Sequence, residues 1–203
     1  MKQSLRPDLG PFNVSRETEE RLEAFVQVLQ AWSPQLNLVS RHDLGAVWPR
    51  HVIDSLQLVQ FIPVGLSHAI DLGSGAGFPG LIIAIAAPIH VHLIESDRRK
   101  AAFLREAARV SGTVVSIHAE RIEALAIPRA PLVTARALAP LPRLLTLAAP
   151  LVAESGTCLF LKGASAQAEL DEARQHWHMD VRTHESCTSP DAKILEIRDL
   201  RHA

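Results

Sequence analysis

The segment from Ala69 to Gly80 constrains the fold of this chain most strongly. It reads Ala-Ile-Asp-Leu-Gly-Ser-Gly-Ala-Gly-Phe-Pro-Gly, so an apolar run with an acid near its end leads into four closely spaced glycines. Glycines accept positive φ angles and let the backbone approach a ligand closely, and a following helix would direct its free N–H groups into the same space. The pattern therefore predicts a strand, a nucleotide-cofactor loop and a helix in succession.

Glu95 supports a cofactor role for this loop. It follows a second apolar run, from Val91 to Ile94, and an acid at the end of the second strand is where α/β nucleotide folds hold ribose hydroxyls. A glycine-rich turn without a ligand is disfavoured because strand, turn, helix, strand and acid occur in order. The spacing of Gly75, Gly77 and Gly80 also fits the dinucleotide fingerprint, so NAD stays open as an alternative cofactor.

Apolar runs and helical segments alternate from His68 onwards, which predicts a mostly parallel sheet with helices on both faces. A short link through 188–191 joins the last two strands, so the final strand is expected to be antiparallel. Seven such strands are typical of the Rossmann-like class I S-adenosylmethionine methyltransferases, whereas a dehydrogenase would usually need a further substrate domain. Strands are expected near 68–72, 90–95, 113–118, 131–135, 156–161, 179–185 and 192–198, with helices near 79–87, 97–111, 120–124, 140–152 and 164–176.

The N-terminal part has a helical pattern. Ser15 is a good N-cap for an amphipathic helix that Ser33 and Pro34 are expected to stop. A second helical stretch, 47–61, follows a polar link at 40–43. We therefore expect a helical extension over residues 1–62, packed on a Rossmann-like α/β domain over residues 63–203.

The charge distribution and the cysteine content limit the classes of function that the chain can have. The chain of 203 residues has a formal net charge of −1, but residues 97–143 contain nine Lys and Arg against four acids, a local basic surface of the kind that meets a phosphate backbone. Cys158 and Cys187 lack metal-ligand spacing, so no metal is expected. No signal-peptide core is visible and no apolar run approaches the ~20 residues of a membrane span, which predicts a cytoplasmic protein without membrane contact.

Separated motifs from about residue 20 to the C-terminus carry a resemblance to a known family. The motifs are Trp32 with Asn37-Leu38-Val39-Ser40, Arg50-His51-x-x-Asp54-Ser55-Leu56, Phe78-Pro79-Gly80, Leu93-Ile94-Glu95-Ser96, Phe103-Leu104, Arg136-Ala137 and Leu161-Lys162-Gly163. With these motifs the chain resembles the bacterial 16S rRNA guanine-N7 methyltransferases of the RsmG type, the glucose-inhibited division protein B family. It departs from the family at Arg98-Arg99, where a Gly-Lys pair is common, and at Ala135, where a serine often precedes the arginine.

The resemblance implies S-adenosyl-L-methionine as the cofactor. It assigns cofactor contacts to Gly73, Phe78, Ile122, Glu123 and Arg136 and the ribose to Glu95, while the loop pattern adds the remaining contacts. The full expected set is Asp71, Gly73, Gly75, Gly77, Phe78, Glu95, Ile122, Glu123 and Arg136.

The implied acceptor is N7 of a single guanine in the decoding-region loop of 16S rRNA, within the 30S subunit or an assembly intermediate. N7 carries a free lone pair, so no catalytic acid or base is assigned and Arg136 is expected to position the reactants. Arg50, His51, Arg136 and Lys162 are the expected RNA contacts. Salt bridges remain an alternative for Arg136 and Lys162, and a packing role remains one for His51 with Asp54. We expect a monomer.

Three other functions remain open from the sequence. A methyltransferase acting on a protein or small molecule would share every cofactor residue, although the basic segment argues mildly against it. An NAD-dependent oxidoreductase would use the same loop, and cofactor titration would distinguish it. A non-catalytic RNA-binding factor is disfavoured because the loop, Glu95 and Arg136 are all intact.

Overall fold

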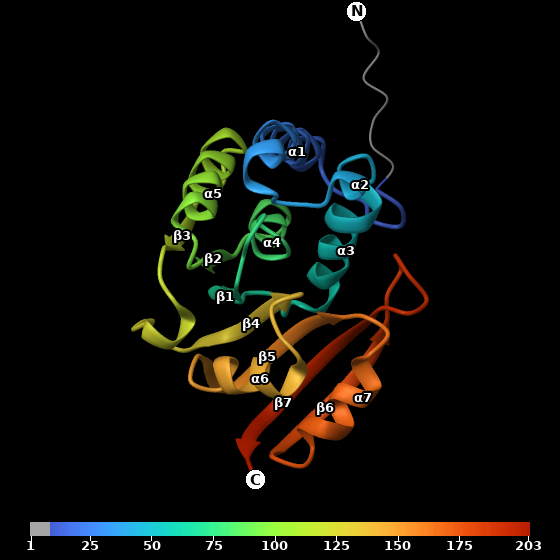
Figure 1. The fold of residues 1–203 in the computed structure, drawn as a ribbon, viewed down its shortest axis with the longest axis vertical. Coiled ribbons are helices and arrows are strands. Elements are labelled where there is room, and N and C mark those ends of the chain that lie inside the picture. Colours follow the sequence, from blue (N-terminus) through green and yellow to red (C-terminus); the bar gives the residue numbers. More distant parts are fainter. Residues whose placement is uncertain (1–8) are drawn as a thin grey trace, which may run out of the picture.

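The fold is built on one seven-stranded sheet in a computed structural model that describes residues 9–203 (Figure 1). The strand order is β3-β2-β1-β4-β5-β7-β6, and β7 runs antiparallel to both of its neighbours while the other six strands are parallel. This confirms the predicted closing hairpin. The strands are β1 His68–Leu72, β2 His90–Ile94, β3 Val115–His118, β4 Ala130–Arg136, β5 Val152–Lys162, β6 Trp177–Glu185 and β7 Lys193–His202.

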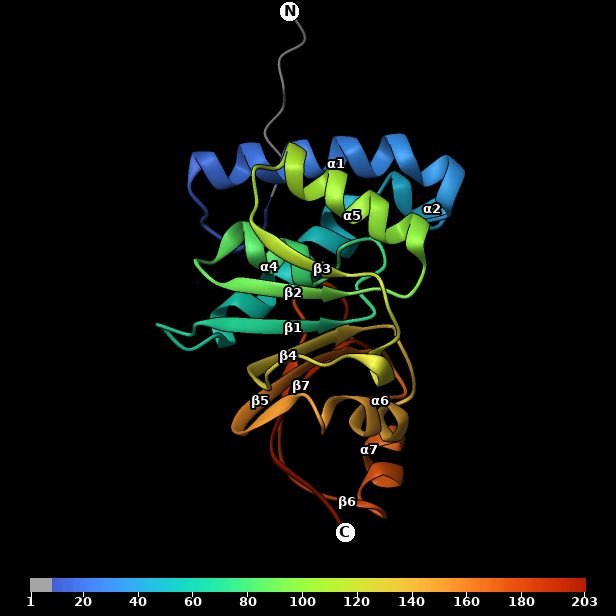
Figure 2. The same cartoon turned by 90° about the vertical axis from the view of Figure 1, so that its left-hand side faces the viewer.

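Helices cover both faces of the sheet. On one face, Val91 and Leu93 of β2 share a buried core with α4 and α5, and α1 packs across those two helices (Figure 2). On the other face, Ile70 and Leu72 of β1 pack in a second core with α6 and α7. The helices are α1 Arg16–Leu36, α2 Arg41–Leu44, α3 Ile53–Leu56, α4 Gly80–Ala86, α5 Arg98–Val110, α6 Leu141–Ala148 and α7 Ala166–Ala173.

The first helix ends later than the sequence predicts. Ser15 caps α1 as expected, but the helix continues through Pro34 to Leu36. A proline this close to the C-terminus removes a single backbone hydrogen bond, and the surrounding packing tolerates that loss. The end is set instead by Asn37, which takes a φ of 47° and donates its N–H to the Ser33 carbonyl at 2.9 Å.

The segment from 40 to 61 is more broken than the sequence predicts. Ser40 accepts a hydrogen bond from the Asp43 N–H and thereby caps the short helix α2, where a polar link was expected. The predicted helix over 47–61 is three successive pieces: a π-helical turn Trp48–Val52, α3, and a 3-10 turn Gln57–Phe61. The helix expected over 120–124 is only a 3-10 turn, Ile122–Ala124.

Candidate active site

The glycine loop lies between β1 and α4, at the carboxyl ends of the parallel strands, where α/β sheets bind ligands (Figure 1). Gly73 has a φ of +65°, and a Cβ added there would lie 2.5 Å from the Leu138 side chain. A Cβ on Gly80 would lie 2.5 Å from Cβ of Asp71. Both glycines therefore permit close approaches that no other residue allows.

Glu95 is fixed at the end of β2. Its Oε2 accepts a hydrogen bond from the Gly75 N–H at 2.9 Å, and its Oε1 accepts one from the Asp97 N–H at 2.7 Å. Only 8% of the residue is exposed. These bonds tie the acid to the loop and to the start of α5, so its carboxylate is held in one orientation.

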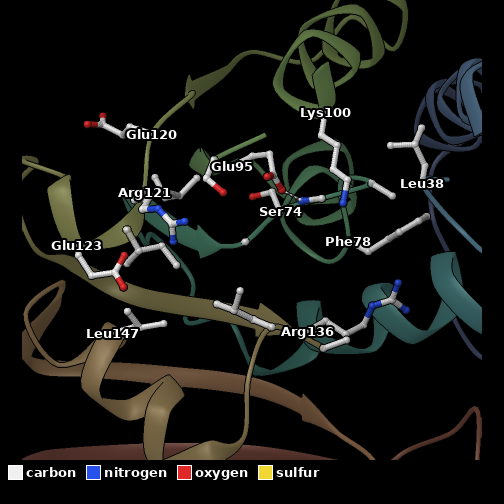
Figure 3. Close-up of a pocket in the computed structure, with 18 residues that line it drawn as sticks. Leu38, Ser74, Phe78, Glu95, Lys100, Glu120, Arg121, Glu123, Arg136 and Leu147 are labelled. Atoms are coloured by element: carbon white, nitrogen blue, oxygen red, sulfur yellow. Dashed lines mark hydrogen bonds between the residues drawn. The ribbon is translucent and has the colours of Figure 1, made fainter. Parts of the chain in front are cut away.

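A cavity of about 450 Å³ opens between the loop and the ends of β2 and β4 (Figure 3), a volume within the range of small-molecule sites. Seven of the nine predicted cofactor residues line it: Gly73, Gly75, Phe78, Glu95, Ile122, Glu123 and Arg136. The wall also includes residues without a predicted role, namely Leu38, Ser74, Ala76, Ile94, Ser96, Lys100, Glu120, Arg121, Ala137, Leu138 and Leu147.

The other two predicted cofactor residues, Asp71 and Gly77, do not line this cavity. Asp71 is fully buried beneath the loop, where it accepts a hydrogen bond from Thr134 Oγ1 at 2.7 Å. Burial raises the pKa of this carboxyl to about 6. Gly77 faces the core, because a Cβ added there would lie 3.3 Å from the Phe25 ring. Both residues therefore support the loop from the side of the protein core, away from the cavity.

Arg136 stands at the boundary between this cavity and a second one. Its Nη1 donates to Asp54 Oδ2 and to the Arg50 carbonyl, each at 3.2 Å, and its guanidinium lies 4.9 Å from the ring centroid of Phe78. The side chain is 17% exposed, and burial lowers its pKa against the opposing effect of Asp54. The ion pair foreseen as an alternative is therefore present, at a position where the side chain also lines both cavities.

The second cavity, of about 800 Å³, shares Arg136 and Ala137 with the first. All four predicted RNA contacts line it, although they come from three separate parts of the chain. The complete lining is Arg50, His51, Asp54, Arg136, Ala137, Leu161, Lys162, Gly163, Ser165, Glu169, Thr188, Ser189 and Ala192. We call it the acceptor cavity.

His51 lines the acceptor cavity and stacks on Phe78, with ring centroids 5.1 Å apart and planes at 28°. Neither ring nitrogen has a hydrogen-bond partner within the part of the chain that the structure describes. Burial, and secondarily the charge of Arg136, lower its pKa to about 4, so the ring is neutral near pH 7. Asp54 has different partners, so these two residues do not form a pair.

Lys162, at the end of β5, forms the salt bridge that was its alternative interpretation. Its Nζ lies 2.6 Å from Glu169 Oε2 and donates to the Ala139 carbonyl at 3.0 Å. Glu169 also accepts a hydrogen bond from the Leu141 N–H at 2.7 Å. The lysine side chain is only 9% exposed, and it braces the segment after β4 against α7.

Sequence reasoning assigned no role to two cationic residues of the cofactor cavity, Lys100 and Arg121. Lys100 had a usable signal, because it lies in the first turn of α5, behind the N-cap Asp97 and shortly after Glu95. Leu38 also lines the cavity, and it belongs to the Asn37-Leu38-Val39-Ser40 motif, for which the sequence predicted no function. Over residues 9–203, no group of His, Cys, Asp and Glu side chains is placed to hold a metal ion, and no helix is long and apolar enough to cross a membrane.

Comparison with known proteins identifies the family. Residues 18–198 match the GidB family, described as rRNA small subunit methyltransferase G. The enzyme of that name from Gluconobacter oxydans is 54% identical over 93% of this chain and 97% of its own length. Its counterpart from Rhodospirillum centenum is 50% identical over 93% of this chain and 88% of its own length.

Solved structures support the fold. A ribosomal protein L11 methylase from Lactobacillus delbrueckii superposes with a TM-score of 0.59 at 17% identity, covering 73% of this chain and 77% of that one. That enzyme is named for a protein acceptor, so the fold alone does not choose between acceptor classes. The sequence match shows the family: the chain belongs to the GidB family, the rRNA small subunit methyltransferases G.

Proposed function

We propose that this enzyme transfers the methyl group of S-adenosylmethionine to N7 of one guanine in 16S rRNA, guanine 527 in the family's numbering. The observation that carries the proposal is the arrangement of two cavities that share Arg136. One is lined by the glycine loop and by Glu95, the acid expected to bind the ribose of a nucleoside cofactor, and the other is lined by the predicted RNA contacts. Family membership favours small-subunit rRNA over a protein or a small molecule as the acceptor.

The residues of the first cavity suit an adenosyl cofactor. Glu95 offers a fixed carboxylate to ribose hydroxyls, and the loop allows close backbone approach at Gly73. Ile122 and Leu138 give apolar surface suited to an adenine ring, and Arg121 and Lys100 line the same cavity. When bound, S-adenosylmethionine supplies an electrophilic methyl group on a sulfonium centre.

The acceptor cavity lacks a strong free base among the described residues, which suits guanine N7 as the nucleophile. His51 has a pKa of about 4 and is a weak base, Asp54 is paired with Arg136, and Glu169 is paired with Lys162. N7 and O6 of guanine are acceptors that an arginine can address with paired donors. We therefore assign to Arg136 the positioning of the base, and to the cavity walls the exclusion of water.

The partner that we propose is the 30S subunit or an assembly intermediate, in the cytoplasm. The basic excess over residues 97–143 supports phosphate contacts. We propose that the protein acts as a monomer. Large exposed apolar side chains among the described residues are few, namely Val64, Val110 and Val114, and do not indicate a dimer surface.

Transfer of labelled methyl from S-adenosylmethionine to 30S subunits that lack the modification tests this function directly. Nuclease digestion should yield a single 7-methylguanosine from the decoding-region loop. A labelled N1 or N2 position would contradict the assigned atom. Cofactor binding without transfer to any RNA would favour a protein or small-molecule acceptor, and binding of NAD in preference to S-adenosylmethionine would contradict the cofactor assignment.

A further inference from the structure

One wall of the acceptor cavity is formed by the loop between β6 and β7, residues 186–192, which contributes Thr188, Ser189 and Ala192. This loop lies next to the segment around α3, although the two are about 130 residues apart in the chain. Side chains of the α3 segment make the contacts that hold it there.

Gln57 makes the first set of contacts. The residue is 1% exposed, and its Oε1 accepts a hydrogen bond from the Cys187 N–H at 3.0 Å. Its Nε2 donates to Ser186 Oγ at 3.1 Å and to Asp54 Oδ1 at 2.9 Å. The amide thus uses both its acceptor and its donor side on the loop, which fixes its orientation.

Asp54 makes the second set and connects the loop to Arg136. Its Oδ1 accepts a hydrogen bond from Thr188 Oγ1 at 2.8 Å, while its Oδ2 accepts the one from Arg136. The carboxylate side chain is 14% exposed, so these bonds form in a partly desolvated site where charge-assisted hydrogen bonds are strengthened. One side chain therefore sets the position of two walls of the acceptor cavity.

We propose that Gln57 and Asp54 are positioning residues that hold the 186–192 loop and Arg136 as one binding surface for the acceptor RNA. Neither residue lines the cofactor cavity. Loss of the bonds that join these residues to the loop should therefore weaken binding of the 30S subunit and leave binding of S-adenosylmethionine unchanged. The identity of the acceptor rests on the proposed function, whereas the attachment of the loop does not.

Two variants separate these claims. Thr188→Val keeps the side-chain shape and removes the O–H donor to Asp54, and Gln57→Ala removes the acceptor of the Cys187 N–H. Thr183→Val, an identical change at an exposed position of β6, is the matched control. We would measure hydrogen exchange over 186–192, the Kd of the full-length protein for 30S subunits and for S-adenosylmethionine, and KM and kcat.

Both variants should exchange their loop amides about five- to tenfold faster, and the Kd and KM for 30S subunits should rise by a similar factor. The control should match the wild type, and the Kd for S-adenosylmethionine should stay the same in all three variants. Unchanged exchange in both variants would overturn the attachment. Faster exchange with unchanged 30S affinity would overturn the positioning role. A wild type that binds no 30S subunit would instead contradict the proposed function. Hydrogen exchange would still test whether Gln57 and Asp54 hold the loop.

Discussion

Gly73 is the residue whose replacement should damage cofactor binding most selectively. Its φ of +65° makes alanine strained, by about 1–2 kcal/mol, and the added Cβ would also displace Leu138 from the cavity wall. Gly112 is a matched control, because it has a φ of +63° with open space around it. Both variants should lose stability from backbone strain, with Gly73→Ala losing at least as much as Gly112→Ala, but only Gly73→Ala should lower affinity for S-adenosylmethionine, by about tenfold or more. Calorimetric titration measures this, and equal affinities would contradict it.

Arg136→Lys tests the planar guanidinium rather than the charge. Lysine keeps the positive charge but loses the planar guanidinium that lies over the Phe78 ring while its Nη1 donates to Asp54 and to the Arg50 carbonyl. We expect kcat for methyl transfer to fall by about tenfold or more, because positioning of the base is lost. Arg16→Lys, at an exposed ion pair with Glu20, is the comparison and should stay near wild type. Equal kcat in both variants would remove Arg136 from its assigned role.

Local chemistry explains which site residues the sequence predicts. The glycine loop and Glu95 were accessible because their spacing directly reflects backbone conformation and strand ends. The side-chain direction of Asp71 was not, since only the packed sheet shows that it points towards Thr134 and away from the cavity. Lys162 has the same limitation, because its partner Glu169 is known only once β5 and α7 meet.

At the scale of elements, a cluster of histidines spans the neighbouring strands β1, β2 and β3. His92 stacks on His118 and contacts the rings of His68 and His90, while Glu120 lies 3.8 Å from His118. Burial, and then the charges of these three neighbours, lower the pKa of His92 to about 4. The strands therefore bring together rings that cannot all be protonated without repulsion.

The lowered pKa values of His92 in this cluster and of His51 predict that acid lowers the stability of the fold. The unfolded state has the ordinary histidine pKa of 6.5, so between pH 6.5 and about 4 it binds more protons than the folded state at His51 and His92. The contribution of these two histidines to the free energy of unfolding should therefore be fully present above pH 6.5 and should be lost as the pH falls towards 4. Asp71 acts in the opposite direction, because its pKa is raised.

The variant His92→Gln should show a smaller decrease than wild type over this interval, whereas His178→Gln, at an exposed position of β6, should follow wild type. Urea unfolding at several pH values measures the difference. An identical pH dependence in wild type and His92→Gln would mean that His92 does not contribute.

Element prediction succeeded for the seven strands, and pattern and packing agree most clearly in the central strands β1 and β4, where successive residues are buried on both faces. It failed over 47–61, where a helical pattern covers three different kinds of turn. The reason lies in long-range contacts: Gln57, at the start of the 3-10 turn, is bound to a loop 130 residues away. Such contacts leave no local signal in the sequence.

At the scale of the whole molecule, the N-terminal extension and the α/β domain share one hydrophobic core. Phe25 of α1 is fully buried and packs edge-on against Phe78 of the cofactor loop at 5.4 Å, and against Phe103 of α5 at 6.5 Å. The division at residue 62 stays a prediction about sequence organisation. The shared core indicates that both parts unfold as one cooperative unit.

Tryptophans at opposite ends of the molecule can test this cooperativity. Trp32 of α1 packs against Phe103, whereas Trp177 lies buried in β6. In variants that keep Trp32 or Trp177 as the single fluorophore, with Trp48 also replaced, the fluorescence midpoint should equal the midpoint from circular dichroism of the same variant. Adding Phe25→Ala should lower both midpoints together, by a free energy of about 3–5 kcal/mol, because the cavity lies in the common core. If only the Trp32 transition moved, the extension would be an independent unit, and its contact with Phe78 would not be needed to hold the cofactor loop.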